Sequence, residues 1–527
     1  MYNKLAIDFG TSNTVVAFWD EEKQDVVLHH IPDVTLPFHF NQDGKELEIP
    51  YIPSLIYYQD IKTRFIGYQV IEKSLERSQG AFRWMKAYIH SKRMMEFPLP
   101  DGNRIDYRQA ARDFLENIIL FAHQSGHVDF SSCEVIFSVP VESFEYYTDW
   151  LSDACLKIGV RRYRFIDEPT ACIFGYAPHL QLKDIFLIFD FGGGTLDVSI
   201  IRIEEEVKGG KGCFVLGKAG CHIGGRSIDG WIYNDILNKA KISALDARQA
   251  SGLFMRQVEE IKEKLTNETS VKYDLRHEPT KLRLEGIYAR TMFEDLMEEN
   301  GLYIAVQETL DRALKDAYEK GIKKEALLVG GTSQIPSIRR QVRTLFGEKT
   351  KYYRPYDAVA RGACKFLTSG AGMYDHILHD YALKGYDSKT GTHHFEPLVP
   401  KGTRYPTKSD FKQLTLKAVR DGQRFFGIDI YEIAQKGVFT LGAGELIRNL
   451  NGDWVYETQR QDVEAGTEFW MNEKKPTFIE ANPPGERGVP RFSIVFSVDA
   501  QKRLVMTVRD IKTQSLVYQD YPVVKLK

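Results

Sequence analysis

The sequence predicts an α/β protein with two similar lobes, followed by a smaller β-rich domain. Three observations lead to this prediction. The tripeptide Asp-Phe-Gly begins at Asp8 and again at Asp190, each time between two short apolar strands. Segments with helical apolar spacing separate further strand-like segments as far as about residue 370. From Leu414 to Ile430, apolar and polar residues alternate as they do in half-buried strands.

The composition is ordinary for a globular protein and argues against several other classes. A chain of 527 residues is too long for one hydrophobic core, so we expect roughly three or four compact units. The formal net charge of −2 gives no electrostatic reason to expect nucleic acid or a membrane as a partner. No apolar run approaches the roughly 20 residues that span a bilayer, and the N-terminus lacks a signal-peptide pattern. The six cysteines form no CxxC pair, so we expect reduced thiols in a cytoplasmic protein.

The second Asp-Phe-Gly hairpin contains three consecutive glycines. The apolar run Phe186–Phe189 ends in Asp190, and Gly192, Gly193 and Gly194 lead into the next strand. Without side chains, these glycines let backbone N–H groups close on an anion such as a phosphate. Asp190 and Asp197 bracket the turn, where they could hold a hydrated divalent cation or orient a water molecule. Taken alone, the triplet is equally typical of a plain tight turn.

The first hairpin repeats this arrangement. A strand at residues 5–7 ends in Asp8, a turn follows at residues 10–13, and a second strand begins at Val15. Two such hairpins in one chain predict two similar lobes, each of which presents a phosphate-binding turn to a shared cleft.

Two charged residues between the hairpins are candidates for the same cleft. Lys86 lies among apolar residues and is either an exposed helix lysine or a positive charge aimed at a transferring phosphate. Glu168 lies at the end of a strand and just before a helix, where Pro169 fits the first turn.

Three further segments follow the second hairpin. Gly224 and Gly225 would let backbone approach a ligand, and residues 253–265 have the spacing of an amphipathic helix. Residues 294–318 are expected to be helical as well. A strand at residues 326–329 runs into Gly330-Gly331-Thr332-Ser333, which is typical of a nucleotide-approach loop. Residues 355–363 begin a helix of small residues that allows close packing.

Taken in this order, the segments resemble the DnaK (70-kDa heat-shock protein) family, within the superfamily that also contains actin and sugar kinases. The matching segments are AIDFGTSNT at 6–14, DEPTA at 167–171, IFDFGGGTLDVSI at 188–200, HIGG at 222–225, LLVGGTSQIPSI at 327–338 and DAVARGA at 357–363. Residues 398–408 and 488–510 resemble strands of the family's β-sandwich, for which a simple accessory β-domain is the alternative. The resemblance implies an actin-like (ribonuclease H-like) ATPase domain at 1–370, a linker at 371–381 and a β-sandwich at 382–527 without a helical lid.

The resemblance also implies a Mg-ATP site between the two lobes. Asp8 and Asp190 would lie near the hydrated Mg²⁺ and the attacking water, and Lys86 would be the catalytic lysine. Glu168 would help to order metal-bound water, while Thr195 and Asp197 would support hydrolysis. The residues implied in binding the phosphates and adenosine are Gly10, Thr11, Ser12, Asn13, Gly192, Gly193, Gly194, Thr195, Gly224, Gly225, Glu259, Lys262, Thr266, Gly330, Gly331, Thr332, Ser333 and Gln334.

The sequence departs from the family pattern in several places. Glu263 and Gln334 stand where many members have arginine, so a stacking contribution of roughly 1 kcal/mol would be missing and nucleotide affinity would be weaker. The linker contains two histidines, and residues 387–395 lack the aliphatic residues that arch over bound peptide in the family. Residues 433–487 contain an insertion.

These features predict an ATP-hydrolysing, chaperone-like protein that couples nucleotide state to the binding of a client polypeptide. Co-chaperones are possible partners. The alternative is a nucleotide-switched adaptor or filament protein whose β-domain binds one dedicated partner. A sugar kinase is a third possibility, against which the GGTSQIP segment and the C-terminal strands argue.

Overall fold

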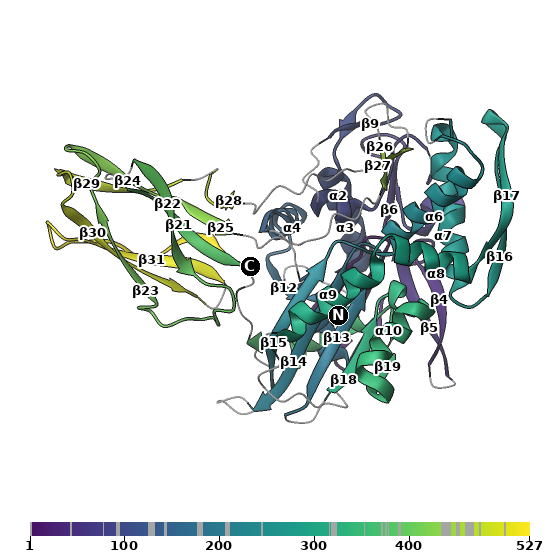
Figure 1. The fold of residues 1–527 in the computed structure, drawn as a ribbon, viewed down its shortest axis with the longest axis horizontal. Coiled ribbons are helices and arrows are strands. Elements are labelled where there is room, and N and C mark those ends of the chain that lie inside the picture. The colour runs from purple at the N-terminus through teal and green to yellow at the C-terminus, as the bar shows by residue number, and fades with distance from the viewer. Residues whose placement is uncertain are drawn as a thin grey trace. The chain divides into compact units, whose positions relative to one another are not determined.

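The computed structural model shows an α/β chain that divides into two compact units (Figure 1). Unit 1 comprises Met1–Gly372 and Phe439–Gln461, and unit 2 comprises Met373–Val438 and Asp462–Lys527. The structure describes residues 3–42, 45–76, 78–90, 95–124, 132–141, 145–176, 183–205, 211–243, 246–315, 317, 324–352, 354–369, 373–374, 377, 379–387, 391–433, 444–448, 454–458, 468–473, 476–499 and 502–526. Several residues of the expected linker lie outside this set, so the expected domain limits stay a prediction.

Two mixed sheets form the framework of unit 1. The first contains β1 (Lys4–Phe9), β2 (Asn13–Asp20), β3 (Asp25–Leu28), β4 (Leu36–Gln42), β5 (Lys45–Pro53), β11 (Glu134–Val139) and β12 (Arg162–Asp167). The second contains β13 (Ile185–Phe191), β14 (Leu196–Glu205), β15 (Lys211–Cys221), β18 (Lys324–Val329) and β19 (Thr350–Tyr352). Their central strands are apolar and almost entirely buried, as strands covered on both faces must be.

The strand order is the same in both sheets. The first runs β3-β2-β1-β11-β12 and the second β15-β14-β13-β18-β19, with the first three strands antiparallel and the last three parallel. Each Asp-Phe-Gly hairpin therefore occupies the same place in its sheet. This topology agrees with the internal repeat that the two hairpins indicate.

Helices and small sheets complete unit 1. The helices are α1 (Tyr68–Glu72), α2 (Met85–His90), α3 (Tyr107–Gln124), α4 (Glu145–Ile158), α5 (Glu168–Gly175), α6 (Gly225–Lys239), α7 (Ser251–Leu265), α8 (Arg290–Glu299), α9 (Leu302–Lys315), α10 (Pro336–Phe346) and α11 (Ala358–Ser369). The remaining strands of unit 1 are β6 (Leu55–Tyr58), β7 (Arg64–Ile66), β8 (Ala81–Arg83), β9 (Phe97–Pro98), β10 (Arg104–Ile105), β16 (Ser270–His277), β17 (Leu282–Ala289), β26 (Gly444–Arg448) and β27 (Trp454–Thr458).

One helix expectation is wrong in detail. The segment 294–318 is not a single helix, because α8 ends at Glu299 and α9 begins at Leu302. Gly301 has a φ of 70°, which a right-handed helix cannot accommodate. The small-residue helix α11 does pack closely: a Cβ at Gly362 would lie 1.6 Å from the carbonyl oxygen of Ala171 in α5.

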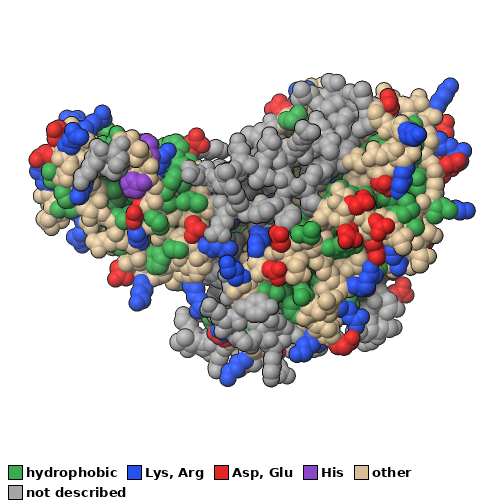
Figure 2. Space-filling view, viewed as in Figure 1, with side chains coloured by type: hydrophobic (Ala, Val, Ile, Leu, Met, Phe, Trp, Pro, Cys, Tyr) green, Lys and Arg blue, Asp and Glu red, His purple; other side chains and the backbone are tan. Residues whose placement is uncertain are grey.

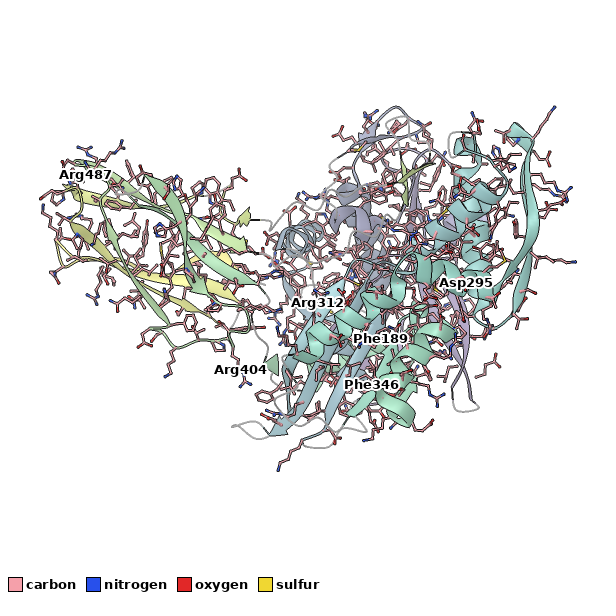
Figure 3. All side chains as sticks on the ribbon, in the orientation of Figure 1. Phe189, Asp295, Arg312, Phe346, Arg404 and Arg487 are labelled. Carbon is pink, nitrogen blue, oxygen red and sulfur yellow. The ribbon has the colours of Figure 1, made fainter. Side chains whose placement is uncertain are left out.

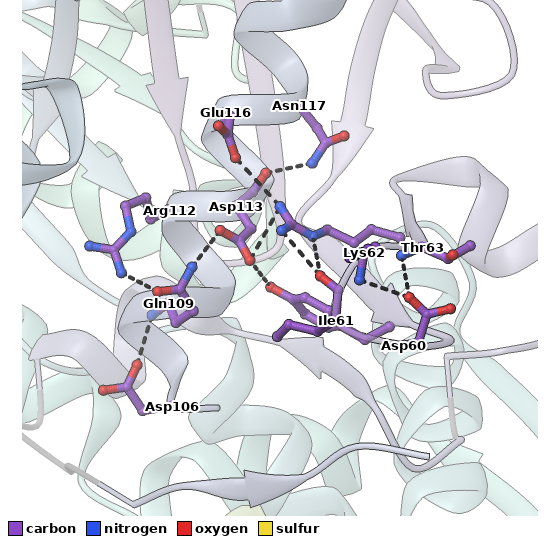
Figure 4. A network of polar contacts seen from close by, with 12 residues as sticks. Asp60, Ile61, Lys62, Thr63, Asp106, Gln109, Arg112, Asp113, Glu116 and Asn117 are labelled. Carbon is purple, nitrogen blue, oxygen red and sulfur yellow. Dashed lines mark hydrogen bonds and ion pairs between the residues drawn. The ribbon is translucent and has the colours of Figure 1, made fainter. Parts of the chain in front are cut away.

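A buried polar network attaches the sheet β7-β6-β8 to helix α3 (Figure 4). The carboxylate of Asp113 accepts hydrogen bonds from the Tyr58 hydroxyl and from Gln109 Nε2, both at 2.6 Å. Arg64 Nη1 lies 3.3 Å from the same carboxylate. Strand β8, which pairs with β6 in this sheet, ends two residues before α2, the helix that carries Lys86.

Figure 3 labels residues of unit 1 that differ in burial. Phe189 lies on β13 and is completely buried, whereas Asp295 on α8 is exposed. Within the described part of the chain, no helix is both long and apolar enough to cross a membrane. All six cysteines belong to unit 1, and none forms a disulfide.

Unit 2 consists of strands in its described part. They are β20 (Met373–Tyr374), β21 (Asp380–Asp387), β22 (Thr392–Val399), β23 (Lys412–Lys417), β24 (Gln423–Ile428), β25 (Ile430–Ile433), β28 (Glu468–Trp470), β29 (Thr477–Gly485), β30 (Pro490–Val498), β31 (Arg503–Asp510) and β32 (Leu516–Lys525). They form the sheets β22-β21-β25-β28 and β23-β30-β31-β32 and the pair β24-β29 around one apolar core. Arg491 is buried in this unit and donates to Asp510 at 2.7 Å.

Candidate active site

Four carboxylates of unit 1 act on one another beside the turns of the two hairpins. They belong to Asp8, Glu168, Asp190 and Asp197. Asp8 is the penultimate residue of β1 and Asp190 the penultimate residue of β13. Burial raises the pKa of Asp190 well above its ordinary value, and the negative charges of Glu168, Asp197 and Asp8 raise it further. These carboxylates are therefore close enough to repel one another. Such an arrangement is unfavourable in an isolated protein and typical of a site that receives cations.

Lys86 supplies the positive charge of this cluster. Its Nζ donates to Glu168 Oε1 at 2.5 Å, and both side chains are buried. Burial alone would lower the pKa of Lys86, but the charges of Glu168, Tyr147 and Asp8 outweigh burial and raise it. Lys86 is therefore a buried cation of this cluster and not an exposed helix lysine.

Glu168 is held by the start of helix α5. The preceding residue, Asp167, is the N-cap and accepts a hydrogen bond from Thr170 N at 2.9 Å. Pro169 occupies the first turn, where its missing N–H costs nothing. The sequence Asp-Glu-Pro-Thr thus fixes both the end of β12 and the direction of the Glu168 side chain.

Asp8 has a neighbour that the sequence did not reveal. Ser138 is completely buried on β11 and donates from Oγ to Asp8 Oδ1 at 2.6 Å. Burial and the charge of Glu168 raise the pKa of Asp8 to about 6, while Lys86 and Ser138 lower it. Asp8 therefore changes its charge just below neutral pH.

A backbone N–H group from the first half of unit 1 holds the side chain of Asp197. Its Oδ1 accepts a hydrogen bond from Val141 N at 2.9 Å, and the residue is 2% exposed. Tyr147 on α4 and Cys172 on α5 also belong to this environment, because the charges of the cluster act on the pKa of both groups. Sequence spacing did not point to either residue.

The turns of the two Asp-Phe-Gly hairpins face each other directly. A Cβ at Gly194 would lie 2.7 Å from Thr11 Oγ1, and a Cβ at Gly193 would lie 2.9 Å from Ser12 Oγ. A side chain at either position would have to displace one of these hydroxyl groups. Gly193 and Gly194 therefore let the two hairpins approach each other closely.

A second glycine loop, Gly224-Gly225, packs against the triplet and forms backbone hydrogen bonds with it. The backbone N–H of Gly225 donates to Gly192 O at 3.1 Å, and Arg226 N donates to Gly193 O at 2.9 Å. A Cβ at Gly224 would lie 2.5 Å from the backbone of Gly193 and Gly194, which cannot rotate away. Helix α6 begins at this loop and directs its N-terminus toward the triplet.

A third loop joins the same group. Thr332 Oγ1 donates to Gly192 O at 2.8 Å, and a Cβ at Gly330 would lie 2.7 Å from Asp190 Oδ1. Gly330 has a φ of 82°, a conformation that favours glycine. The structure therefore brings the predicted loops 10–13, 192–195, 224–225 and 330–334 into one cluster.

The side chains predicted to contact adenosine are engaged by other residues of unit 1. Lys262 Nζ forms an ion pair with Asp229 Oδ1 at 2.8 Å, and Glu259 Oε1 accepts from Arg83 Nη2 at 2.6 Å. Thr266 Oγ1 donates to the backbone oxygen of Glu263 at 2.6 Å. Burial raises the pKa of Asp229 to about 7 even though Lys262 lowers it. Gln334 accepts a hydrogen bond from Arg339. Their roles toward a nucleotide stay predictions.

The donor chemistry of the cluster fits Mg²⁺ that keeps its water ligands. Carboxylate oxygens are the groups that Mg²⁺ prefers, and it usually binds through one or two of them and through substrate phosphates. Among the described residues, no group of three or more His, Cys, Asp or Glu is placed to hold a metal ion by itself. Asp8 and Asp190 are the carboxylates that would hold such an ion through its water ligands.

Comparisons with known proteins bear on the whole chain. A family model described as Hsp70 protein matches residues 133–439, more than half of the chain. A chaperone protein DnaK of Thermotoga petrophila is 24% identical over 97% of this chain and 80% of its own length. A chaperone protein DnaK of Trichormus variabilis is 25% identical over 98% of this chain and 72% of its own length. A heat shock 70 kDa protein of Emericella nidulans is 28% identical over 69% of this chain and 53% of its own length. The matched segment contains Glu168, the glycine triplet and the loops around it, so the chain belongs to the Hsp70 protein family.

Proposed function

We propose that the protein is a cytoplasmic, chaperone-like ATPase in which nucleotide state controls the binding of a client polypeptide. In this proposal unit 1 is a two-lobed, actin-like ATPase domain and unit 2 is a β-sandwich that binds the client. The observation that carries the proposal is the cluster of Asp8, Glu168, Asp190, Asp197 and Lys86 between two glycine turns that face each other. Membership of the Hsp70 family supports the same conclusion.

The residues of the cluster have complementary tasks in this mechanism. The backbone N–H groups of the two turns bind the phosphates, and Lys86 neutralises charge that develops on the transferred group. Asp190 and Asp197 orient the attacking water, and Glu168 holds Lys86 in place. Bound Mg²⁺ would offset the charge of the phosphates and relieve the repulsion among the carboxylates. Such chemistry depends on positioning, because phosphoryl transfer needs little covalent help from the protein.

The direct test is ATP turnover by the full chain, with and without a permanently unfolded protein. We expect slow basal turnover that requires Mg²⁺ and rises several-fold when the unfolded protein is present, because coupling of about 1–3 kcal/mol is typical between such sites. Absence of turnover under both conditions would refute the proposed activity. Basal turnover that the unfolded protein does not raise would support the proposed ATPase activity and refute its coupling to unfolded clients.

The second candidate is a nucleotide-switched adaptor whose unit 2 binds one dedicated partner. The segment expected to arch over a peptide favours it: in its described part, residues 391–395 read Gly-Thr-His-His-Phe and contain no aliphatic side chain. Residues 388–390 lie outside the described set. Binding of a short apolar peptide to the full chain separates the candidates, since the adaptor would bind no such peptide in either nucleotide state.

A further inference from the structure

Trp84 has an unusual backbone conformation two residues before Lys86. Its φ is 57°, in the left-handed region that residues with a side chain seldom adopt. Strand β8 ends immediately before Trp84 and helix α2 begins immediately after it, so the chain turns at this one residue. The Trp84 carbonyl oxygen then accepts hydrogen bonds from Ala87 N at 3.0 Å and from Tyr88 N at 3.3 Å. The conformation of Trp84 therefore sets the direction in which α2 and Lys86 leave the strand.

Such a conformation needs support from the surrounding structure. It is unfavourable for a residue with a side chain and persists only where the surroundings enforce it, which is most common at functional sites. Trp84 is 1% exposed, so its ring is enclosed by the protein. The groups that hold this ring thus decide whether the turn is kept, and with it the place of Lys86.

Two guanidinium groups lie over the ring of Trp84. The Cζ atom of Arg83 is 4.0 Å from the centroid of this ring, and the Cζ atom of Arg226 is 5.7 Å from it. Arg226 Cζ is also 6.0 Å from the ring centroid of Tyr88, which is buried on α2. A cation within about 6 Å of an aromatic centroid is attracted to it, most strongly where water is excluded. Trp84 and Tyr88 flank Lys86 in the sequence, so both contacts of Arg226 act on the segment that carries Lys86.

Both arginines are held by the part of unit 1 that contains the glycine triplet. Arg83 Nη2 donates to Glu259 Oε1 on α7 at 2.6 Å, and both side chains are mostly buried. Arg226 is the second residue of α6, and its backbone N–H donates to Gly193 O at 2.9 Å. Arg226 thus contacts the triplet with its backbone and the segment of Lys86 with its side chain.

We propose that Trp84 is a positioning residue for Lys86 and that Arg226 links the ring of Trp84 to the glycine triplet. When the triplet closes on the phosphates, Arg226 draws the start of α2 with it and brings Lys86 to the transferred group. Neither Trp84 nor Arg226 takes part in the chemical step. This inference rests on the proposed ATPase function and goes beyond it, because it adds two residues that the sequence did not indicate.

The test measures single-turnover hydrolysis of Mg-ATP and binding of ATP separately on the full chain. Arg226→Met removes the charge and keeps a long side chain, and Trp84→Leu removes the aromatic face and keeps an apolar residue. Each should slow hydrolysis by about tenfold or more, because misplacement of a catalytic group is costly, and change the dissociation constant of ATP by less than about threefold. Trp84→Phe keeps an aromatic face and should hydrolyse within about threefold of the wild-type rate.

A double variant tests whether the two residues act together. Arg226→Met combined with Trp84→Leu should be about as slow as Trp84→Leu alone, because both changes remove one contact. A loss equal to the product of the single losses would show that the residues act independently and would overturn the link. Circular dichroism checks the fold of each variant. Arg226 is only half-buried, so Arg226→Met decides the question if Trp84→Leu does not fold.

Arg164→Met is the matched control, because Arg164 Cζ lies 4.7 Å from the ring centroid of Phe366, a cation–aromatic contact outside the cluster. It should hydrolyse ATP like wild type. A wild-type rate in Arg226→Met overturns the inference, and so does a loss of ATP affinity as large as the loss of rate, which would mean that Arg226 binds the nucleotide itself. In these cases the proposed function survives, whereas failure of wild type to hydrolyse ATP refutes that function and this inference together.

Discussion

Lys86 and Glu168 show how a buried ion pair depends on both of its members. The two side chains are 2.5 Å apart and lie beside Asp8 and Asp190. Removing one member of a buried pair leaves an uncompensated charge, which typically costs about 3–5 kcal/mol, whereas replacing both members often costs little. The pair is therefore better understood as a charge held ready for the substrate than as a source of stability.

The first prediction follows from this asymmetry. Lys86→Met should lower the free energy of unfolding by about 3–5 kcal/mol, because Glu168 then faces the other carboxylates without a cation. Lys86→Met combined with Glu168→Gln should lower it by clearly less. Urea denaturation of Lys86→Met, of Glu168→Gln and of the double variant measures the difference. A double variant as unstable as the sum of the single variants would show that the two charges do not interact.

Asp8 provides the second prediction, which concerns pH. Its pKa in the folded protein is about 6, above the ordinary value of 3.8, so the folded protein holds the proton more tightly than the unfolded chain. The stability that this proton provides is complete below the ordinary pKa and is lost as the pH rises through about 6. Asp8→Asn avoids this loss and should be more stable than wild type by about 1–3 kcal/mol near pH 8.

Thermal unfolding of Asp8→Asn and wild type between about pH 4 and about pH 8 checks this prediction. The advantage of the variant should shrink as the pH falls. Ser138→Ala serves as the comparison, because it removes the hydrogen bond to Asp8 and leaves the carboxylate in place. An advantage that does not depend on pH would mean that Asp8 is not the titrating group.

At the scale of elements, the two glycines of the HIGG loop differ in what surrounds them. A Cβ at Gly224 would meet backbone atoms of the triplet at 2.5 Å. A Cβ at Gly225 would meet the ends of two side chains, Thr332 Oγ1 at 2.9 Å and Lys262 Nζ at 3.1 Å. Side-chain ends can move, whereas the backbone of the triplet cannot move without changing its turn.

Gly224→Ala should therefore reduce ATP turnover far more than Gly225→Ala. We expect a loss of about 100-fold or more for the first, since misplacement by about 1 Å has that effect on positioning chemistry, and a loss of less than about tenfold for the second. Single-turnover hydrolysis measures both, and circular dichroism shows whether the fold is kept. Equal losses would indicate that the loop does not position the triplet.

The elements show which parts of the fold can be predicted from sequence. Both hairpins and α7 follow from local apolar spacing and glycine positions, which act over a few residues. The break at Gly301 was missed because apolar spacing continues across it, and only the backbone conformation ends the helix there. Ser138 and Tyr147 were missed because their place beside Asp8 and Lys86 depends on strand pairing and helix packing between distant segments.

At the scale of the whole molecule, charge is distributed without a dominant sign. The drawn face shows basic and acidic side chains mixed over both units (Figure 2), in agreement with a net charge of −2. Apolar side chains are exposed on unit 2, among them Phe425 on β24 at 59% and Phe478 on β29 at 52%. A partner of this protein would therefore be recognised by local shape and apolar contacts more than by long-range attraction.

In the proposed function, the carboxylates at the ends of β1 and β13 carry out ATP hydrolysis. This role is tested most directly by single-turnover hydrolysis of Mg-ATP by the full chain and by Asp190→Ala, with Asp295→Ala as control. Asp295 is an exposed aspartate on α8, so its loss changes charge without touching the cluster. We predict that Asp190→Ala loses about 100-fold or more in rate while it still binds nucleotide, and that Asp295→Ala hydrolyses like wild type. A wild-type rate in Asp190→Ala would contradict the claim.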